Sequence, residues 1–191
     1  MVDVLGHLGM ALLWALPVWL FYQRRVSLVF IGLVVTTAHL PDVDLLLLGV
    51  LPIVHHGITH TVLFVTAVSL VAGAIAEFKL GTWIEQQWLE GEHELLSKWG
   101  LYAFTTGAFL LGGFSHLFAD MLSAPDIAKP VEPFWPLVAK PWSVDIAWYS
   151  SPWWNSGLLL VAITAHLVLG YLVVRAGRPI VASLRGQESP R

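Results

Sequence analysis

Five apolar stretches run along the chain, and each has about the length of a membrane-crossing helix. They cover residues of about 4–22, 26–54, 59–78, 101–122 and 157–174, and the second is interrupted at 41–44 by Pro41, Asp42 and Asp44. A helix needs about 20 apolar residues to cross the bilayer core. The pattern therefore predicts an all-α integral membrane bundle of about five transmembrane helices, with residues 1–191 forming a single domain.

Two polar connectors separate these stretches. Residues 79–98 place Trp83, Trp88 and several leucines among four glutamates, which predicts an amphipathic helix along the membrane interface. Residues 123–155 contain six prolines. Because proline disrupts both helices and central strands, we predict that this connector is an irregular outer loop folded over the mouth of the bundle.

Arginines near the ends of the apolar stretches predict the orientation in the membrane. Arg24 and Arg25 follow the first stretch, and Arg175, Arg178 and Arg185 follow the fifth. With five spans both groups fall on one side, and basic residues flanking spans favour the cytoplasm. We therefore predict a plasma-membrane protein with its N-terminus outside and its C-terminus in the cytoplasm.

The composition supports the membrane class and limits the chemistry. Hydrophobic residues make up 57% of the 191 residues and charged residues 12%, whereas a soluble domain carries about a quarter charged residues. The net charge of −3 argues against a nucleic-acid partner, and ten tryptophans fit an interfacial belt. Because the chain has no cysteine, any transition metal must be bound by histidine and carboxylate ligands.

Histidine and aspartate residues from four separate segments fall at the same predicted membrane face. They are His7; Asp42 and Asp44; His55, His56 and His60; and His116 with Asp120. Ionisable groups in or near membrane spans are costly and usually functional. Their gathering at the outer face predicts a metal site there.

Simpler structural explanations exist for several of these residues. His116 and Asp120 are four apart on one helix face, so they could hydrogen-bond between neighbouring helices. Asp42 or Asp44 could only cap a helix after the break at Pro41. If that stretch is helical, at most one of the two carboxylates faces the site.

The segment His55-His56-Gly57-Ile58-Thr59-His60 is the strongest local signal. Three imidazoles surround a glycine that permits a tight turn, and Thr59 can cap the following helix. Three imidazoles near two carboxylates indicate metal coordination, with His55 among the candidate ligands.

The other histidines carry weaker signals. His39 is close to Asp42 in sequence but could face away from the site. His93 lies in the glutamate-rich connector, where we expect it to be solvated. His166 falls in the middle of the last apolar stretch, and we predict a packed, hydrogen-bonded helix residue there.

Four short motifs occur in an order that resembles a known family. They are Gly-His-Leu-Gly at 6–9, Leu-Pro-Asp-Val-Asp at 40–44, His-His-Gly-Ile-Thr-His-Thr at 55–61 and Ser-His-Leu-Phe-Ala-Asp-Met-Leu-Ser at 115–123. They resemble the YdjM-like family of membrane-bound metal-dependent hydrolases over about residues 6–137. More distantly, they are similar to the zinc-dependent phospholipase C and single-strand nuclease superfamily. The resemblance implies that the metal ligands are His7, Asp44, His60, His116 and Asp120.

The chain departs from the family pattern at two places. His56 stands where the family usually has an arginine, which would suit an anionic oxygen, so we predict His56 as a catalytic residue at the substrate. Ala124 and Pro125 replace the usual residues after the last motif. Nothing after Asp120 supplies the later ligands of the distant zinc enzymes, so we expect one metal ion or at most two.

The leading hypothesis is a metal-dependent hydrolase. Imidazole and carboxylate ligands suit zinc, with manganese or iron as alternatives, and a bound ion activates water. Asp42 is the candidate base that accepts the proton of that water. A site at the interface under an aromatic loop fits an amphiphilic, lipid-like substrate, and the distant resemblance implies a phosphoester.

Two other functions remain compatible with the sequence. One is a membrane metal-binding or transport protein without hydrolysis, because intramembrane histidine and aspartate can line an ion path. Such a path should place polar residues at all depths, yet the inner halves of the first, third and fourth stretches are almost wholly apolar. The other is a structural bundle whose polar residues only bind helices together.

Overall fold

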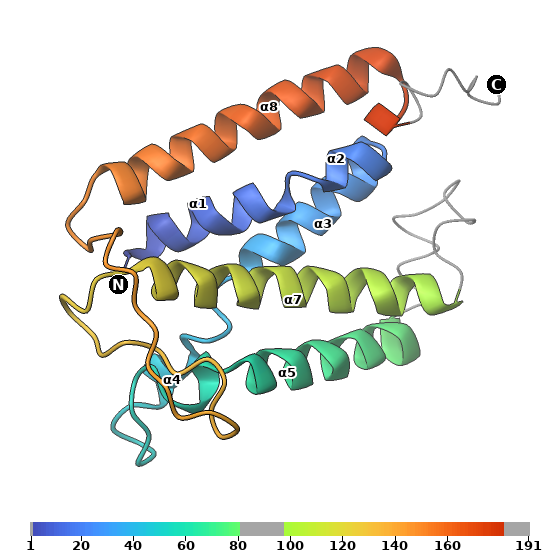
Figure 1. Cartoon of the computed structure of the whole chain (residues 1–191). Coiled ribbons are helices and arrows are strands. Elements are labelled where there is room, and N and C mark those ends of the chain that lie inside the picture. The colour runs from blue at the N-terminus through green and yellow to red at the C-terminus, as the bar shows by residue number, and fades with distance from the viewer. Residues whose placement is uncertain (1, 81–97, 182–191) are drawn as a thin grey trace.

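The computed structural model describes residues 2–80 and 98–181, and this part of the chain is helical without a β-strand (Figure 1). The main helices are α1 (Val4–Ala15), α2 (Val18–Phe21), α3 (Arg24–Thr37), α4 (Val43–Leu47), α5 (Val62–Ile75), α7 (Lys98–Leu122) and α8 (Leu158–Ala176). Short 3-10 or π-helical turns are η1 (Ile58–His60), η2 (Ala76–Leu80) and η3 (Trp153–Gly157). The all-α prediction is confirmed.

Four helical segments within the described residues are long and apolar enough to cross a membrane. They are Val4–Phe21, Val62–Lys79, Gly100–Leu122 and Trp153–Ala176. Residues 81–97, which make up most of the predicted interfacial helix, lie outside the described part of the chain, and so does Arg185. The orientation of the termini stays a prediction.

The predicted second span does not form one long helix. Helix α3 has 14 residues, which at about 1.5 Å per residue covers about 21 Å of a core about 30 Å thick. It ends before Pro41, which lacks a backbone N–H and disfavours helical geometry at the residue before it. The chain then turns and forms only the five-residue helix α4. Helix α3 nevertheless runs back along α1, so Arg24 and Arg175 lie at the same end of the bundle (Figure 1).

Close helix packing brings the end of α3 against α7. Ala11, Ala15, Val34, Ala38 and Ala108 form a buried cluster of small side chains. Gly112 is required in α7, because a Cβ atom there would lie 2.2 Å from Thr37 Oγ1 and 2.6 Å from the Val34 carbonyl oxygen. Small residues let membrane helices approach this closely. The contact places the Ala38 carbonyl beside the last turns of α7.

The segment between α7 and η3 contains no regular helix or strand and lies across the end of the bundle that carries α4 (Figure 1). Isolated bridges pair Ser123 with Ala147 and Val131 with Trp142. The Val62 amide donates a hydrogen bond to the Pro133 carbonyl at 2.8 Å. These bonds hold the segment against the start of α5.

Candidate metal centre

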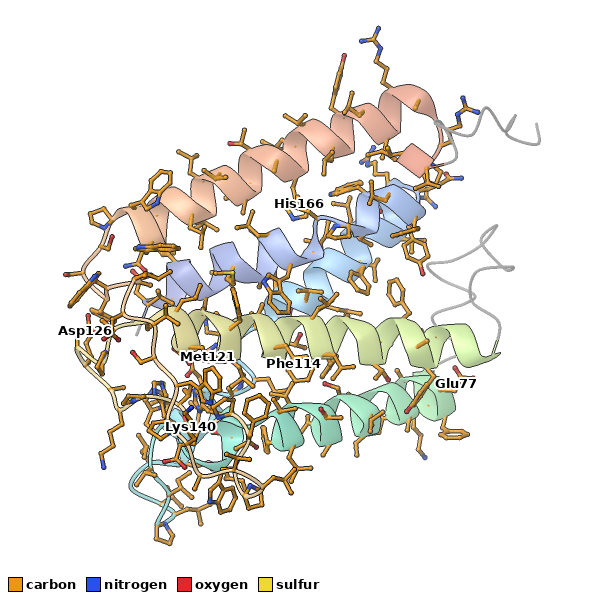
Figure 2. All side chains as sticks on the ribbon, in the orientation of Figure 1. Glu77, Phe114, Met121, Asp126, Lys140 and His166 are labelled. Atoms are coloured by element: carbon orange, nitrogen blue, oxygen red, sulfur yellow. The ribbon has the colours of Figure 1, made fainter. Side chains whose placement is uncertain are left out.

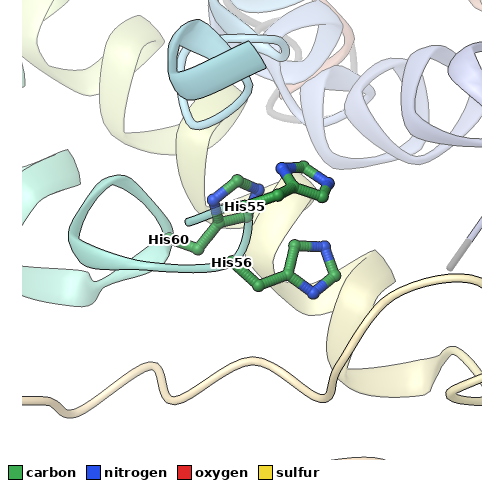
Figure 3. A group of neighbouring side chains, drawn as sticks. All are labelled: His55, His56 and His60. Carbon is green, nitrogen blue, oxygen red and sulfur yellow. The ribbon is translucent and has the colours of Figure 1, made fainter. Parts of the chain in front are cut away.

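Ionisable side chains from α1, α4, η1 and α7 meet at one end of the bundle. His7, Asp44, His60, His116 and Asp120 are all at most 3% exposed. Figure 3 shows the turn before α5, where the rings of His55, His56 and His60 lie close together with centroids 4.3 to 5.0 Å apart. The four segments predicted to meet at one membrane face therefore do meet.

The break at Pro41 lets both aspartates of the second motif reach this cluster. Asp42 precedes α4 with φ −71° and ψ 2°, while Asp44 lies in its first turn. The two side chains are thus not constrained to opposite faces of one helix. Asp42 makes no capping hydrogen bond, so the capping explanation does not account for its position.

Two nitrogens and two oxygens in the cluster have nitrogen–oxygen distances close to those of a tetrahedral metal site. Asp42 Oδ1 lies 3.4 Å from Nε2 of both His60 and His116. Asp120 Oδ2 lies 3.8 Å and 3.2 Å from the same two nitrogens. Ligands bound at about 2.0–2.1 Å in a tetrahedron lie about 3.3–3.4 Å apart. All four atoms are buried and lack a hydrogen-bond partner, so the residues fit a metal ion.

The other nitrogen of each ring is held by a neighbour. His116 Nδ1 lies 2.7 Å from the Ala38 carbonyl, to which it can only donate. His60 Nδ1 lies 3.1 Å from Thr59 Oγ1, and His56 Nδ1 donates to the Lys129 carbonyl. A proton on Nδ1 leaves the lone pair on Nε2, which then points at the cluster. Such outer bonds orient metal-binding histidines.

Asp44 lies one layer outside these four atoms. Its Oδ1 is 3.1 Å from His55 Nδ1, and its Oδ2 accepts the Thr59 hydroxyl at 3.1 Å. Burial acts to raise the pKa of Asp44, but hydrogen bonds from His60 and His55 outweigh it and lower that pKa to about 2. Both oxygens of this ionised carboxylate are therefore already engaged by protein donors.

His7 and His56 add two further open nitrogens beside Asp120. His7 Nε2 lies 3.5 Å from Asp120 Oδ1, and its ring stacks on that of His116 at 3.8 Å. His56 Nε2 lies 3.7 Å from Asp120 Oδ2. His56 has a left-handed φ of 61°, which is uncommon for a residue other than glycine. Burial lowers the pKa of His56 to about 4.

The cluster offers more open atoms than one tetrahedral ion uses. Four overlapping groups each have ligand atoms within 4.8 Å of one another: His55, His56 and His60; His7, His116 and Asp120; Asp42, His60 and His116; and Asp42, Asp44 and His55. These buried groups could hold a metal ion. The shared members join all eight residues into one continuous centre.

Some participants carried no clear sequence signal. The carbonyls of Ala38 and Lys129 are backbone groups, so residue type does not reveal them. Thr59 does not cap α5, because Thr61 occupies that position and accepts the Phe64 amide at 3.1 Å. His39, left undecided from the sequence, lies with its ring centroid 6.2 Å from that of His116.

The remaining histidines behave differently. His166 sits on α8, away from the cluster (Figure 2). Its Nδ1 accepts the Trp19 indole N–H at 2.7 Å, and its Nε2 donates to the Leu12 carbonyl at 2.9 Å. The predicted hydrogen-bonded helix residue is thereby confirmed. His93 lies outside the described residues.

A pocket of about 450 Å³ opens beside the cluster, and His56 forms part of its wall. Val54, Ile58 and Trp135 contribute an apolar rim, while Glu132 adds one acidic group. The three apolar side chains are exposed. The pocket therefore joins an open ring of the cluster to an apolar surface.

The chain belongs to the YdjM inner membrane protein family, whose profile matches residues 1–184. No curated protein and no solved structure matches the chain. The family resemblance of the four motifs is thus confirmed, and with the four apolar helical segments it makes this a membrane protein. The distant similarity to zinc-dependent phospholipase C and nucleases has no support from these comparisons.

Proposed function

We propose that this chain is a membrane-bound hydrolase that uses a divalent metal ion to activate water against a phosphoester in a lipid-like substrate. Zinc suits the ligand set best, with manganese or iron as alternatives. One observation carries the proposal: two ring nitrogens each lie 3.2 to 3.8 Å from the same two carboxylate oxygens, and all four atoms are buried without hydrogen-bond partners.

The contacts favour an exchange of the roles predicted for the two aspartates. Asp42 Oδ1 faces the open nitrogens of His60 and His116, so we assign Asp42 as a ligand rather than the base. Asp44 hydrogen-bonds to His55 and Thr59 and lies close to His60 Nδ1, so we assign it to orienting the rings. Asp120 is the second carboxylate ligand, and His7 and His55 complete the outer part of the centre.

The metal ion, when bound, polarises the attacked oxygen and lowers the pKa of a bound water towards about 7. His56 is the group that contacts both the cluster and the pocket. Its Nδ1 bond to Lys129 leaves Nε2 free to accept the proton of the attacking water. In the proposed reaction, the oxygen of the water adds to phosphorus, the phosphorus–oxygen ester bond breaks, and the leaving alcohol takes the proton that His56 accepted from the water.

The surface around the pocket supports an amphiphilic substrate. Leu46 and Val50, just before the pocket residues 52–54 in sequence, are 80% and 78% exposed, and Leu137, two residues after Trp135, is 87% exposed. Exposed apolar groups in such number mark contact with a membrane or an apolar ligand. An anionic phosphoester would suit the metal centre, while an acyl chain would suit the rim.

The hydrogen bonds of polar side chains in the rest of the bundle give less support to a transport function. Ser69 and Thr37 donate their hydroxyl protons to carbonyls of their own helices at 2.7 and 2.8 Å. His166 is paired through both ring nitrogens. These polar groups satisfy themselves rather than lining a path for an ion.

Metal analysis combined with hydrolysis assays tests the proposal. We would purify the wild type, Asp42→Asn and His116→Ala in detergent, measure bound metal by mass spectrometry, and assay a panel of phospholipids. We expect stoichiometric metal and turnover in the wild type and loss of both in the variants. Full metal content in both variants would refute the ligand assignment. Bound metal without turnover of any ester would refute the hydrolase and leave metal binding alone.

A further inference from the structure

A second hollow lies between α8 and α3, near the end of the bundle opposite the metal centre. It has a volume of about 420 Å³ and reaches from Arg24 at the start of α3 past Leu28, Trp19 and Leu167. Helix α8 packs mainly on α1 and contacts α3 little, which leaves this groove open between them. We call it the Arg24 groove.

The groove has the length of one membrane leaflet. On α8 its wall runs from Ile163 to Val174, which are 11 residues apart and therefore about 16 Å apart along the helix axis. One leaflet contributes about half of a hydrocarbon core about 30 Å thick. Arg24 stands at the boundary end of the groove, and only uncharged side chains line its deeper part.

The deep part of the groove offers nothing for water to bind. Its polar rings, His166 and Trp19, are hydrogen-bonded to each other, and the second nitrogen of His166 is bonded to the Leu12 carbonyl. Leu28 and Leu167 present exposed apolar surface along the groove, at 50% and 69% exposure. Buried water needs polar partners, so hydrocarbon suits this space better.

The charge at the groove's open end selects the headgroup. Arg24 lines the groove itself, while Arg25 and Arg175 lie on helix turns at the same end of the bundle (Figure 1). A guanidinium binds phosphate oxygens through paired hydrogen bonds. The positive end therefore complements a negatively charged lipid headgroup.

We propose that the Arg24 groove binds one phospholipid with an anionic headgroup. One acyl chain lies along α8, and the headgroup phosphate contacts Arg24. This site is separate from the metal centre and does not depend on the proposed hydrolysis. The bound lipid fills the space between α3 and α8 that side chains leave open.

Native mass spectrometry of the full chain tests this proposal. Protein in detergent would be exposed to phosphatidylglycerol or to phosphatidylcholine, and the retained lipid counted. We expect about one phosphatidylglycerol per chain and an apparent affinity at least about tenfold above that for phosphatidylcholine, because the choline cation of phosphatidylcholine offsets the phosphate charge that faces the arginines. Equal retention of the two lipids by the wild type would overturn the proposal.

Matched variants locate the lipid. Leu28→Trp fills the groove, whereas Leu160→Trp places the same ring at an exposed site on α8 outside it. We expect the first to lose phosphatidylglycerol and the second to keep it. Arg24→Gln should abolish the preference for the anionic lipid, and Arg24→Lys should retain most of it. Equal lipid retention in both tryptophan variants would refute the site, and Leu167→Trp replaces Leu28→Trp if the latter does not fold.

Discussion

Two histidines on membrane helices, the buried His116 in α7 and the half-buried His166 in α8, use their ring nitrogens in opposite ways. His166 has a hydrogen bond at each nitrogen, at 2.7 and 2.9 Å. His116 has one bond, to Ala38, and turns its second nitrogen towards Asp42 and Asp120 at 3.4 and 3.2 Å without a hydrogen bond to either. Buried polar atoms are rarely left unpaired. The His166 ring joins helices, whereas the His116 ring has a nitrogen that could bind a cation.

Asp44 and Asp120 differ in the same way, because only one of them has hydrogen-bond partners for its carboxylate oxygens. Asp44 has both oxygens engaged by His55 and Thr59. Both oxygens of Asp120 are buried without a hydrogen-bond partner and face histidine nitrogens. Proximity alone therefore does not define a ligand. What separates the proposed ligands from Asp44 is whether another protein group already satisfies the atom that faces the centre.

The largest expected effect comes from replacing each of these two histidines with alanine. His116→Ala should lower zinc affinity by more than about 100-fold, since even loss of an outer-shell partner costs 10–100-fold. His166→Ala should keep stoichiometric zinc but lose stability by about 1–3 kcal/mol, because the Trp19 N–H is left unpaired. Metal content and thermal unfolding measured on both variants separate these outcomes. Equal metal loss in the two variants would abolish the distinction.

The aspartate pair predicts a graded result. Asp120→Asn should remove metal binding, because it replaces a carboxylate whose two oxygens both face histidine nitrogens. Asp44→Asn should weaken zinc binding by about 10–100-fold through looser orientation of His60 and His55. Competition titration with a zinc-binding dye measures both affinities. If Asp44→Asn were as severe as Asp120→Asn, Asp44 would have to be assigned as a direct ligand.

Metal removal should lower stability only where the centre is intact. An ion that binds the folded state alone stabilises it by about 4 kcal/mol at a thousandfold excess over its Kd. We expect EDTA to lower the melting temperature of the wild type and of His166→Ala, and to leave that of His116→Ala unchanged. A shift of equal size in all three proteins would mean that the stabilising ion binds elsewhere.

The helices could be predicted where apolar runs match the bilayer, and the second span shows where hydropathy misleads. Residues 45–54 continue the apolar run after Asp44, yet α4 ends at Leu47 and Gly49 has a left-handed φ of 84°. Hydropathy measures affinity for an apolar environment and does not report the backbone turn. An apolar loop therefore resembled the end of a helix.

The centre could be predicted as a set of residues but not as a set of roles. Motif order indicated that four segments converge, because each places an ionisable group next to an apolar run. The distinction between Asp42 and Asp44 depends on α4 beginning at Val43, a boundary that the sequence pattern does not define. The carbonyls of Ala38 and Lys129 orient two rings, and any residue type could provide them.

The smallest expected effect on zinc affinity concerns Thr59, which makes different hydrogen bonds from the nearby Thr61. Thr59 donates its hydroxyl to Asp44 and lies 3.1 Å from His60 Nδ1, whereas Thr61 caps α5. Thr59→Val keeps the shape but removes this link, so zinc affinity should fall by about tenfold, the lower end of outer-shell effects. Thr61→Val should leave zinc affinity unchanged and cost about 1 kcal/mol of stability through the lost cap.

The same dye titration and unfolding measurements read out both threonine variants. Both substitutions exchange a hydroxyl for a methyl group at sites that are buried, so burial itself does not distinguish them. A difference in zinc affinity must then come from the hydrogen bond to Asp44 rather than from packing. If Thr61→Val weakened zinc binding as much as Thr59→Val, the local fold of the turn before α5 would control the centre, and the chain of bonds from Thr59 to His60 would not.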